Sequence, residues 1–169
     1  MSGTRIFTTE RLALRELTTG DAGFILALTN DADWLRFIGD RGIRNLDDAR
    51  RYIETGPRSM YAEHGFGLYA VEGKDAQVAI GLCGLLRRPW LDHPDLGFAF
   101  LPSARGRGFA FEAAAATLAH AKSALNFGRV LAIVTPGNAP SIRVLEKLGM
   151  HFERMARPAA DEQEVCVYG

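Results

Sequence analysis

The residues of this chain with the clearest chemical potential lie in the run LPSARGRGFA at 101–110. Arg105, Gly106, Arg107 and Gly108 alternate there between a predicted strand and a predicted long helix. The first turn of a helix has unpaired amides and the positive end of the helix dipole, and glycines let an anion approach the backbone closely. Arginine side chains add charged donors that can bind an anion through two hydrogen bonds. We therefore expect this segment to bind a phosphate-bearing ligand, and a pyrophosphate would fit.

Two common nucleotide-binding patterns do not match this loop. A dinucleotide fingerprint, G-x-G-x-x-G, requires a third glycine where Phe111 stands, and the strand about 20 residues further on lacks the acid that binds ribose. A P-loop requires Gly-Lys followed by Ser or Thr, which occurs nowhere in the chain. The pattern that fits is R-x-x-G-x-A, from Arg105 to Ala110.

The elements that must position this loop follow a mixed α/β order. Apolar alternation predicts a first strand at 5–17, and Asp21 and Asn45 are the expected N-caps of two helices. Gly56-Pro57 should break the second helix, which resumes to about Glu63. The remaining pattern predicts strands at 66–71, 78–86 and 96–101, a helix at 109–125, a strand at 130–134, a helix at 139–148, and a strand pair at 152–157 and 164–168.

With its R-x-x-G-x-A loop, the sequence resembles the GCN5-related N-acetyltransferase (GNAT) superfamily, whose acetyl-CoA pyrophosphate loop has the form Q/R-x-x-G-x-G/A. Further segments carry the resemblance across nearly the whole chain: TERLALR at 9–15, IGLCG at 80–84, DLGF at 95–98, and NAPS at 138–141 leading to LEKLGM at 145–150. The first of these is similar to the opening strand of the branch that acetylates ribosomal-protein N-termini. Met150 stands where the family usually has Phe.

The resemblance implies a single GNAT domain over residues 1–169. Its mixed, mostly antiparallel sheet of about seven strands would carry helices on both faces, and strands four and five would splay apart around the pantetheine arm of acetyl-CoA. Main-chain groups of strand four would bind the pantetheine amides, the loop amides would bind the pyrophosphate, and Asn138 would bind the pantetheine arm. The cofactor-binding residues expected on this basis are Phe98, Phe100, Leu101, Arg105, Gly106, Arg107, Gly108, Phe109, Ala110, Asn138 and Ser141.

Several of these residues have simpler structural interpretations. Arg105 and Arg107 could be solvated loop charges, and Asn138 could serve only as a helix cap, a role in which asparagine is favoured. Glu112 matches a motif acid in the first turn of the long helix, where a negative charge complements the helix dipole. We interpret Glu112 as structural.

Acetyl transfer from a thioester to an amine requires a neutral amine, stabilisation of an oxyanion, and a proton for the departing thiolate. Many family members supply that proton from a Tyr four residues after the motif Ser, a position that Leu145 occupies in this chain. By resemblance to the ribosomal-protein branch, Ser141 is the candidate acid, and helix capping is its alternative role.

Asp95 and His93 are the candidate bases, with ordinary pKa values of about 3.9 and about 6.5. A carboxylate that is so weakly basic would act through water. The alternatives are an ion pair with an Arg for Asp95 and an exposed loop position for His93. At pH 7 an α-amine with a pKa of about 7.8 is roughly 14% neutral, whereas a lysine amine is roughly 0.04% neutral. A site without a strong base therefore favours a protein or peptide N-terminal α-amine, and a low-pKa small-molecule amine satisfies the same argument.

Trp34 and Trp90 fall in the segments that would flank the acceptor groove, so we predict that they bind the acceptor, with the core as their alternative location. The expected activity is acetyl transfer from acetyl-CoA to a primary amine by direct attack in a ternary complex. Two other interpretations stay open. One is an acetyltransferase for small-molecule amines, and the other is a non-catalytic acyl-CoA-binding module, suggested by the missing Tyr.

Composition narrows the class of partner. The 169 residues carry 20 Lys+Arg and 20 Asp+Glu, and a net charge of zero argues against a general nucleic-acid or membrane-surface binder. The 2 cysteines are far apart in sequence, which suits free thiols in a reducing cytosol. Taken with the resemblance, which implies acetyl-CoA and an amine acceptor as the partners, we expect a cytoplasmic enzyme, a monomer or homodimer, that needs no metal, nucleic acid or membrane.

Overall fold

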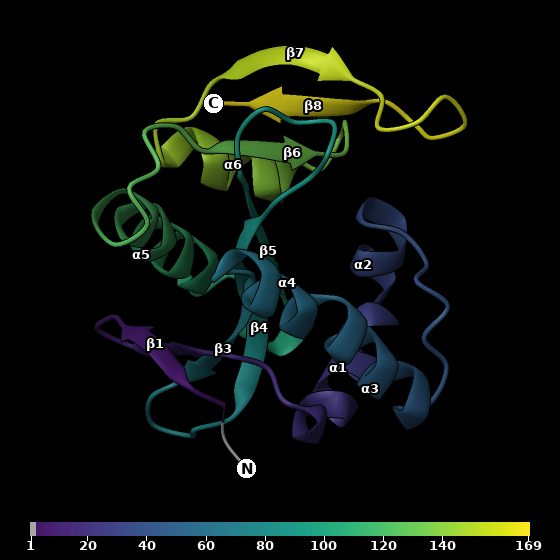
Figure 1. Ribbon diagram of the computed structural model, residues 1–169, viewed down its shortest axis with the longest axis vertical. Coiled ribbons are helices and arrows are strands. Elements are labelled where there is room, and N and C mark those ends of the chain that lie inside the picture. Colours follow the sequence, from purple (N-terminus) through teal and green to yellow (C-terminus); the bar gives the residue numbers. More distant parts are fainter. Residues whose placement is uncertain (1–2) are drawn as a thin grey trace.

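The structure, a computed structural model that describes residues 3–169, is built on an eight-stranded sheet (Figure 1). The strand order is β1-β2-β3-β4-β5-β6-β8-β7, and neighbours run antiparallel except for the parallel pair β5 and β6. The strands are β1 (Arg5–Thr8), β2 (Leu12–Arg15), β3 (Leu68–Gly73), β4 (Ala79–Leu86), β5 (Asp95–Phe100), β6 (Leu131–Val134), β7 (Phe152–Ala156) and β8 (Val165–Tyr168). This confirms the mixed, mostly antiparallel sheet, with one strand more than expected.

The additional strand arises because the predicted first strand, 5–17, is a hairpin. β1 and β2 pair antiparallel across a turn in which the amide of Thr9 donates to the carbonyl of Leu12 at 2.8 Å. The amide of Leu12 in return donates to the hydroxyl of Thr9 at 3.1 Å. This turn contains neither Gly nor Pro, so the apolar alternation continues through it in the sequence. The prediction of a single strand is wrong for that reason.

Four α-helices, preceded by a short 3-10 helix at Thr19–Asp21, lie between β2 and β3, where the sequence predicts two helices, the second of them broken. They are α1 (Ala22–Thr29), α2 (Ala32–Phe37), α3 (Leu46–Thr55) and α4 (Pro57–His64). The break at Pro57 and the N-cap at Asn45 agree with prediction. α2 is not predicted from the sequence, because a helix of 6 residues is too short to show apolar periodicity. Its only clear signal is Asp31, whose side chain accepts from the amides of Asp33 and Trp34.

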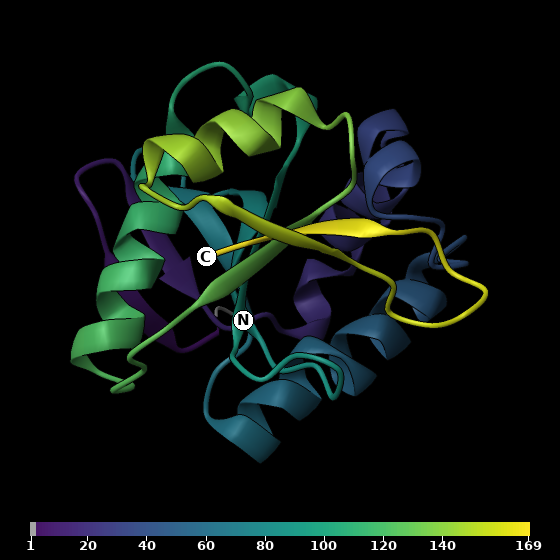
Figure 2. The same cartoon turned by 90° about the horizontal axis from the view of Figure 1, so that it is seen from above.

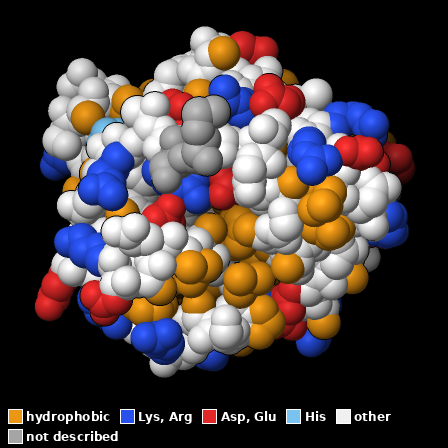
Figure 3. All heavy atoms as spheres, turned by 90° about the horizontal axis from the view of Figure 1, so that it is seen from below, with side chains coloured by type: hydrophobic (Ala, Val, Ile, Leu, Met, Phe, Trp, Pro, Cys, Tyr) orange, Lys and Arg blue, Asp and Glu red, His pale blue; other side chains and the backbone are white. Residues whose placement is uncertain are grey.

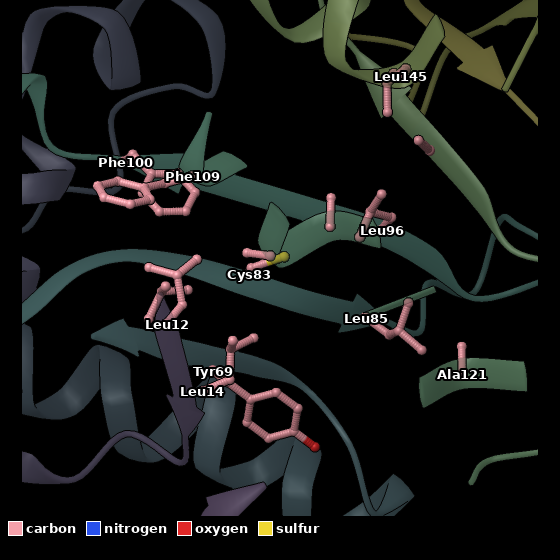
Figure 4. Close-up of a cluster of buried hydrophobic side chains, with 14 of the residues drawn as sticks. Leu12, Leu14, Tyr69, Cys83, Leu85, Leu96, Phe100, Phe109, Ala121 and Leu145 are labelled. Atoms are coloured by element: carbon pink, nitrogen blue, oxygen red, sulfur yellow. The ribbon is translucent and has the colours of Figure 1, made fainter. Parts of the chain in front are cut away.

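The remaining helices are α5 (Phe109–Ser123) and α6 (Ala139–Lys147), which lie on the opposite face of the sheet from α1 and α3 (Figures 1 and 2). The small residues Ala113, Ala114 and Ala121 are fully buried, so α5 packs closely on the sheet. The core on this side includes Leu12 and Cys83 (Figure 4). Within residues 3–169, no helix is long and apolar enough to cross a membrane.

A second core lies under α1 and α3, and a buried ion-pair group stands beside it. Arg15 at the end of β2 pairs with Asp21 at 2.8 Å and also contacts Glu72 of β3. All three side chains are at most 12% exposed. We call these three residues the Arg15 triad, which ties the start of the helical layer to the sheet.

The sheet splits between β5 and β6. These strands pair only at Asp95 with Leu131 and at Leu96 with Ala132, after which β6 continues beside β8 while β5 stays with β4. The amide of Leu101 donates to β4 at 2.9 Å, and main-chain groups alternate sides along a strand. Phe98 therefore turns its amide and carbonyl away from β4, toward the split.

Candidate active site

A cleft of about 1310 Å³ lies at the split in the sheet. It is lined by parts of α2, α3, α4, β5 and β6, by the N-terminal end of α5 and by residues along the length of α6. Most of the residues predicted for the site line this cleft, namely Trp34, Trp90, Asp95, Phe98, Phe100, Arg105, Gly106, Gly108, Phe109, Ala110, Asn138 and Ser141. His93, Leu101 and Arg107 are not among its lining residues. The tertiary structure thus brings together groups that are up to 107 positions apart, from Trp34 to Ser141.

The loop between β5 and α5 leaves its backbone open to close approach. Gly106 and Gly108 have left-handed φ values of 73° and 79°. Beyond the adjacent residues, a Cβ atom at Gly106 would meet nothing in the described part of the chain within 4 Å, and one at Gly108 would meet only Nη2 of Arg11, at 3.4 Å. Gly108 is also the N-cap of α5 and has no side chain with which to cap it. The first-turn amides of α5 therefore retain the capacity to bind an anion.

The guanidinium of Arg105 is engaged outside the loop. It donates to the carbonyl of Phe100 at 3.1 Å and forms ion pairs with Asp31 and, at 2.9 Å, with Asp33 of α2. These contacts match neither of the two predictions for the Arg105 side chain, which were anion binding and a solvated loop charge. The main chain of Arg105 still belongs to the glycine loop.

A different arginine lies against the loop. Arg11, from the turn between β1 and β2, donates to the carbonyl of Arg107 at 2.9 Å and to Glu112 at 2.7 Å. Arg11 and Arg107 both stack on the ring of Phe109, with their guanidinium carbons 4.5 and 4.7 Å from its centroid. Arg11 is not among the predicted site residues, although TERLALR at 9–15 carried the signal. The ion pair of Glu112 agrees with its structural interpretation.

Positive charge at the loop is therefore local. The face of the molecule in Figure 3 mixes basic with acidic side chains around a central group of exposed hydrophobic ones. This mixture matches the net charge of zero. An anion would be recognised by the loop itself and not by a broad electrostatic field.

Asp95 lies at the start of β5, where β5 and β6 are still paired, and it is fully buried. Arg88 donates from Nε to both of its carboxylate oxygens, at 3.0 and 3.2 Å. Burial raises the pKa of Asp95 to about 6, although the nearby Arg88 charge acts in the opposite direction. Asp95 is therefore paired with an Arg, as its alternative interpretation holds, and it is also a better base than an ordinary carboxylate. Of the two candidate bases, Asp95 lines the cleft and His93 does not.

Asn138 and Ser141 stand together at the start of α6. Asn138 is the N-cap, and its side-chain oxygen accepts from the amide of Ser141 at 3.4 Å. The capping interpretation of Asn138 thus matches the structure. Ser141 uses its amide in this contact, and its hydroxyl has no hydrogen-bond partner within residues 3–169. Leu145, one turn later, is 1% exposed and fills the position of the usual Tyr with an apolar side chain.

The two predicted acceptor-binding tryptophans differ in burial. Trp90 is half-buried at the cleft, whereas Trp34 is 5% exposed and packs in the core under α1 and α3. Among residues 3–169, the indole nitrogen of Trp34 is the one buried side-chain nitrogen or oxygen without a hydrogen-bond partner. Trp34 therefore belongs to the core, as its alternative holds, and also lines the cleft.

Comparison with known proteins agrees with this geometry. A family model described as an acetyltransferase (GNAT) domain matches residues 11–151. The uncharacterized protein YkkB of Bacillus subtilis is 30% identical over 154 residues, which cover 88% of this chain and 87% of YkkB. The crystal structure of the acetyltransferase from Agrobacterium tumefaciens is similar with a TM-score of 0.81 and 25% identity, over 100% of this chain and 96% of that one. RimL, a ribosomal L7/L12 α-N-protein acetyltransferase in complex with coenzyme A, has the same fold with a TM-score of 0.80 at 16% identity, over 97% and 96% of the two chains. Because the family model spans most of the sequence, the chain belongs to the GNAT family and is an N-acetyltransferase.

Proposed function

We propose that this protein is a cytoplasmic enzyme that transfers the acetyl group of acetyl-CoA to the N-terminal α-amine of a protein or peptide, by direct attack in a ternary complex. The observation that carries the proposal is the cleft itself. One cleft holds a strand edge open for pairing, a helix N-terminus behind two left-handed glycines, and a buried carboxylate with a raised pKa.

The residues of the cleft fit acetyl-CoA, which supplies a thioester-activated acetyl group. The main-chain amide and carbonyl of Phe98 face the split in the sheet, so they can pair with the pantetheine amides as a neighbouring strand would. The amides of residues 106–110 can bind the pyrophosphate, because the left-handed glycines leave no Cβ atom in the way. Asn138 at the far side of the split can reach the pantetheine arm.

The catalytic roles are assigned to two residues of the cleft. Asp95 accepts the proton of the acceptor amine through water, and its pKa of about 6 makes it suited to an amine that is already partly neutral. Ser141 donates its hydroxyl proton or a hydrogen bond to the departing thiolate, since capping of α6 is performed by Asn138. Trp34 and Trp90, which both line the cleft, form its acceptor side.

The α-amine is the favoured acceptor for a chemical reason. Proton transfer to a base with a pKa near 6 is uphill by roughly two pKa units from an α-ammonium with a pKa of about 7.8 and by more than roughly four from a lysine ammonium with a pKa of about 10.4, so the α-ammonium loses its proton at the smaller cost. The segment 9–15 supports the same class through its resemblance to the ribosomal-protein branch. RimL, which is described as an α-N-protein acetyltransferase, supports the α-amine as acceptor only through its similar fold.

Two measurements test the proposal. In thermal unfolding with acetyl-CoA, CoA, NAD and ATP side by side, only the two CoA species should raise the melting temperature. Ligand at 100 times its Kd would add about 2.7 kcal/mol to the stability. CoA release should then occur with peptides that have a free N-terminus and stop when the α-amine is blocked. If CoA were released with polyamines alone, the acceptor would be a small-molecule amine and not a peptide. If acetyl-CoA bound but no acceptor led to CoA release, the protein would be a non-catalytic acyl-CoA-binding module.

Ser141→Ala tests the assigned acid. We expect turnover to fall while the Kd for acetyl-CoA changes little, because the amide of Ser141 still donates to Asn138. Ser123→Ala is the matched control, since Ser123 is an exposed serine at the end of α5. Equal turnover in Ser141→Ala and the control would remove Ser141 from the mechanism.

A further inference from the structure

The turn between β1 and β2 holds the start of α5 through a group of four hydrogen bonds. Glu112 accepts from the hydroxyl of Thr9 at 2.8 Å, from the amide of Arg11 at 2.9 Å, and from Nε of Arg11 at 2.7 Å. Nη1 of Arg11 donates to the carbonyl of Arg107 at 2.9 Å. We call this group the Arg11 clasp. It connects the first hairpin of the chain to a loop almost a hundred positions later.

The clasp leaves one nitrogen of Arg11 directed at the glycine loop. Nε and Nη1 are engaged, whereas Nη2 has no hydrogen-bond acceptor within residues 3–169. Apart from Gly108 and its two chain neighbours, Nη2 is the one atom of residues 3–169 that lies within 4 Å of the place where a Cβ on Gly108 would be, at 3.4 Å. The side chain of Arg11 is 46% exposed, so solvent reaches part of it.

The fixed orientation of Arg11 suits it to anion binding. Its guanidinium is held on one edge by Glu112 and on one face by the ring of Phe109, 4.5 Å away. A guanidinium that is already ordered loses little conformational freedom when it binds a phosphate oxygen. Arg105, which the sequence favours for this role, is instead paired with Asp31 and Asp33.

We propose that Arg11 is a phosphate-binding residue of the acetyl-CoA site, a role that rests on the acetyl-CoA binding proposed above. Nη2 donates to a phosphate oxygen bound at the loop amides. Nη1 meanwhile holds the carbonyl of Arg107, so that the amides of the same loop keep facing the phosphate. Thr9 and Glu112 are positioning residues, because they act through Arg11.

The test compares ligands with and without phosphate. The Kd values of CoA and of S-acetylpantetheine, which lacks every phosphate, are measured by calorimetry for wild type, Arg11→Ala and Arg11→Lys. We expect Arg11→Ala to weaken CoA binding by roughly 10- to 100-fold, as for the loss of a hydrogen bond to a charged group. Arg11→Lys should also weaken it, because a lysine cannot keep all three contacts. Binding of S-acetylpantetheine should stay the same in both variants. Arg5→Ala is the control, since Arg5 is an exposed arginine of the same hairpin.

The outcomes separate this proposal from the function it rests on. The proposal would be overturned if Arg11→Lys raised the Kd values of CoA and S-acetylpantetheine equally. It would also be overturned if the variant had a lower melting temperature and an unchanged affinity for CoA. Either result would make Arg11 a fold-stabilising residue. Wild-type protein that binds CoA no better than S-acetylpantetheine would instead overturn the pyrophosphate role of the whole loop. If Arg11→Ala does not fold, the two ligands are compared in Arg11→Lys alone, because lysine keeps the charge and most of the side-chain volume.

Discussion

Asp95→Asn should remove a pH dependence of folding that the buried carboxyl imposes on this protein. The side chain of Asp95 is 1% exposed, and Arg88 contacts it at 3.0 Å. Burial disfavours the ionised carboxyl more strongly than Arg88 favours it, so the pKa rises from 3.8 to about 6 in the folded protein. Asparagine has nearly the same shape and does not ionise, so it isolates the effect of the charge.

The magnitude follows from the two pKa values. Well below pH 3.8 the carboxyl is protonated in both the folded and the unfolded chain. As the pH rises from about 4 to about 6, the unfolded chain releases the proton first, so the free energy of unfolding decreases. Above this range both states are ionised and the loss is complete. A difference of about two pKa units corresponds to about 3 kcal/mol, of which about 2 kcal/mol falls between pH 4.5 and pH 8.

Urea unfolding of wild type and Asp95→Asn at several pH values measures this difference. The free energy of unfolding of the variant minus that of wild type should increase by about 2 kcal/mol from pH 4.5 to pH 8. Any constant cost of losing the contact with Arg88 cancels in that comparison. Asp47→Asn is the control, because Asp47 is 85% exposed and the substitution is the same in kind. A difference for Asp95→Asn that stays constant, or decreases with pH, would refute the reasoning and show that Arg88 dominates over burial.

Three further predictions concern the loop, the helical layer and the ion pairs of α2. Gly108→Val should raise the Kd for acetyl-CoA at least tenfold, because its φ of 79° strains a β-branched residue and the side chain blocks the phosphate; titration calorimetry measures this. Arg15→Met should destabilise the fold by roughly 3–5 kcal/mol in urea unfolding, since the two carboxylates of the Arg15 triad stay buried without a cation. Asp33→Asn should tighten CoA binding, by no more than about fivefold, because an exposed ion pair that competes for Arg105 is worth at most about 1 kcal/mol.

Each of these variants has a control or a contrary result. Gly65→Val introduces the same strain at a φ of 77° and an open Cβ position, so it should lower stability without changing the Kd for acetyl-CoA. Unchanged stability in Arg15→Met would mean that the Arg15 triad gains as much from apolar packing as from its ion pairs. Weaker CoA binding in Asp33→Asn would mean that its contact with Arg105 supports the loop and does not compete with the phosphate.

Much of the fold could be predicted because its signals are local. Asn45 caps a helix, Pro57 begins the next one, and the alanine face of α5 packs on the sheet, each as the neighbouring residues indicate. The two departures, the hairpin at 5–17 and the short helix α2, are also local. Thr9 forms the turn and Asp31 forms the helix cap, each through side-chain hydrogen bonds. Such hydrogen bonds do not change the pattern of apolar residues from which strands and helices are predicted.

The sequence alone determined the glycine loop, since a left-handed φ and an uncapped helix start are properties of a few consecutive residues. It also located the cap at Asn138 and the missing Tyr at Leu145. Only the tertiary structure decided which distant groups the arginines contact. Arg105 is drawn to acids 72 and 74 positions earlier, and Arg11 reaches the loop from 96 positions away. The base strength of Asp95 was decided in the same way, because a pKa depends on how much water the packed chain removes. Ion pairing and desolvation act through space, so a pattern of neighbouring residues does not contain them.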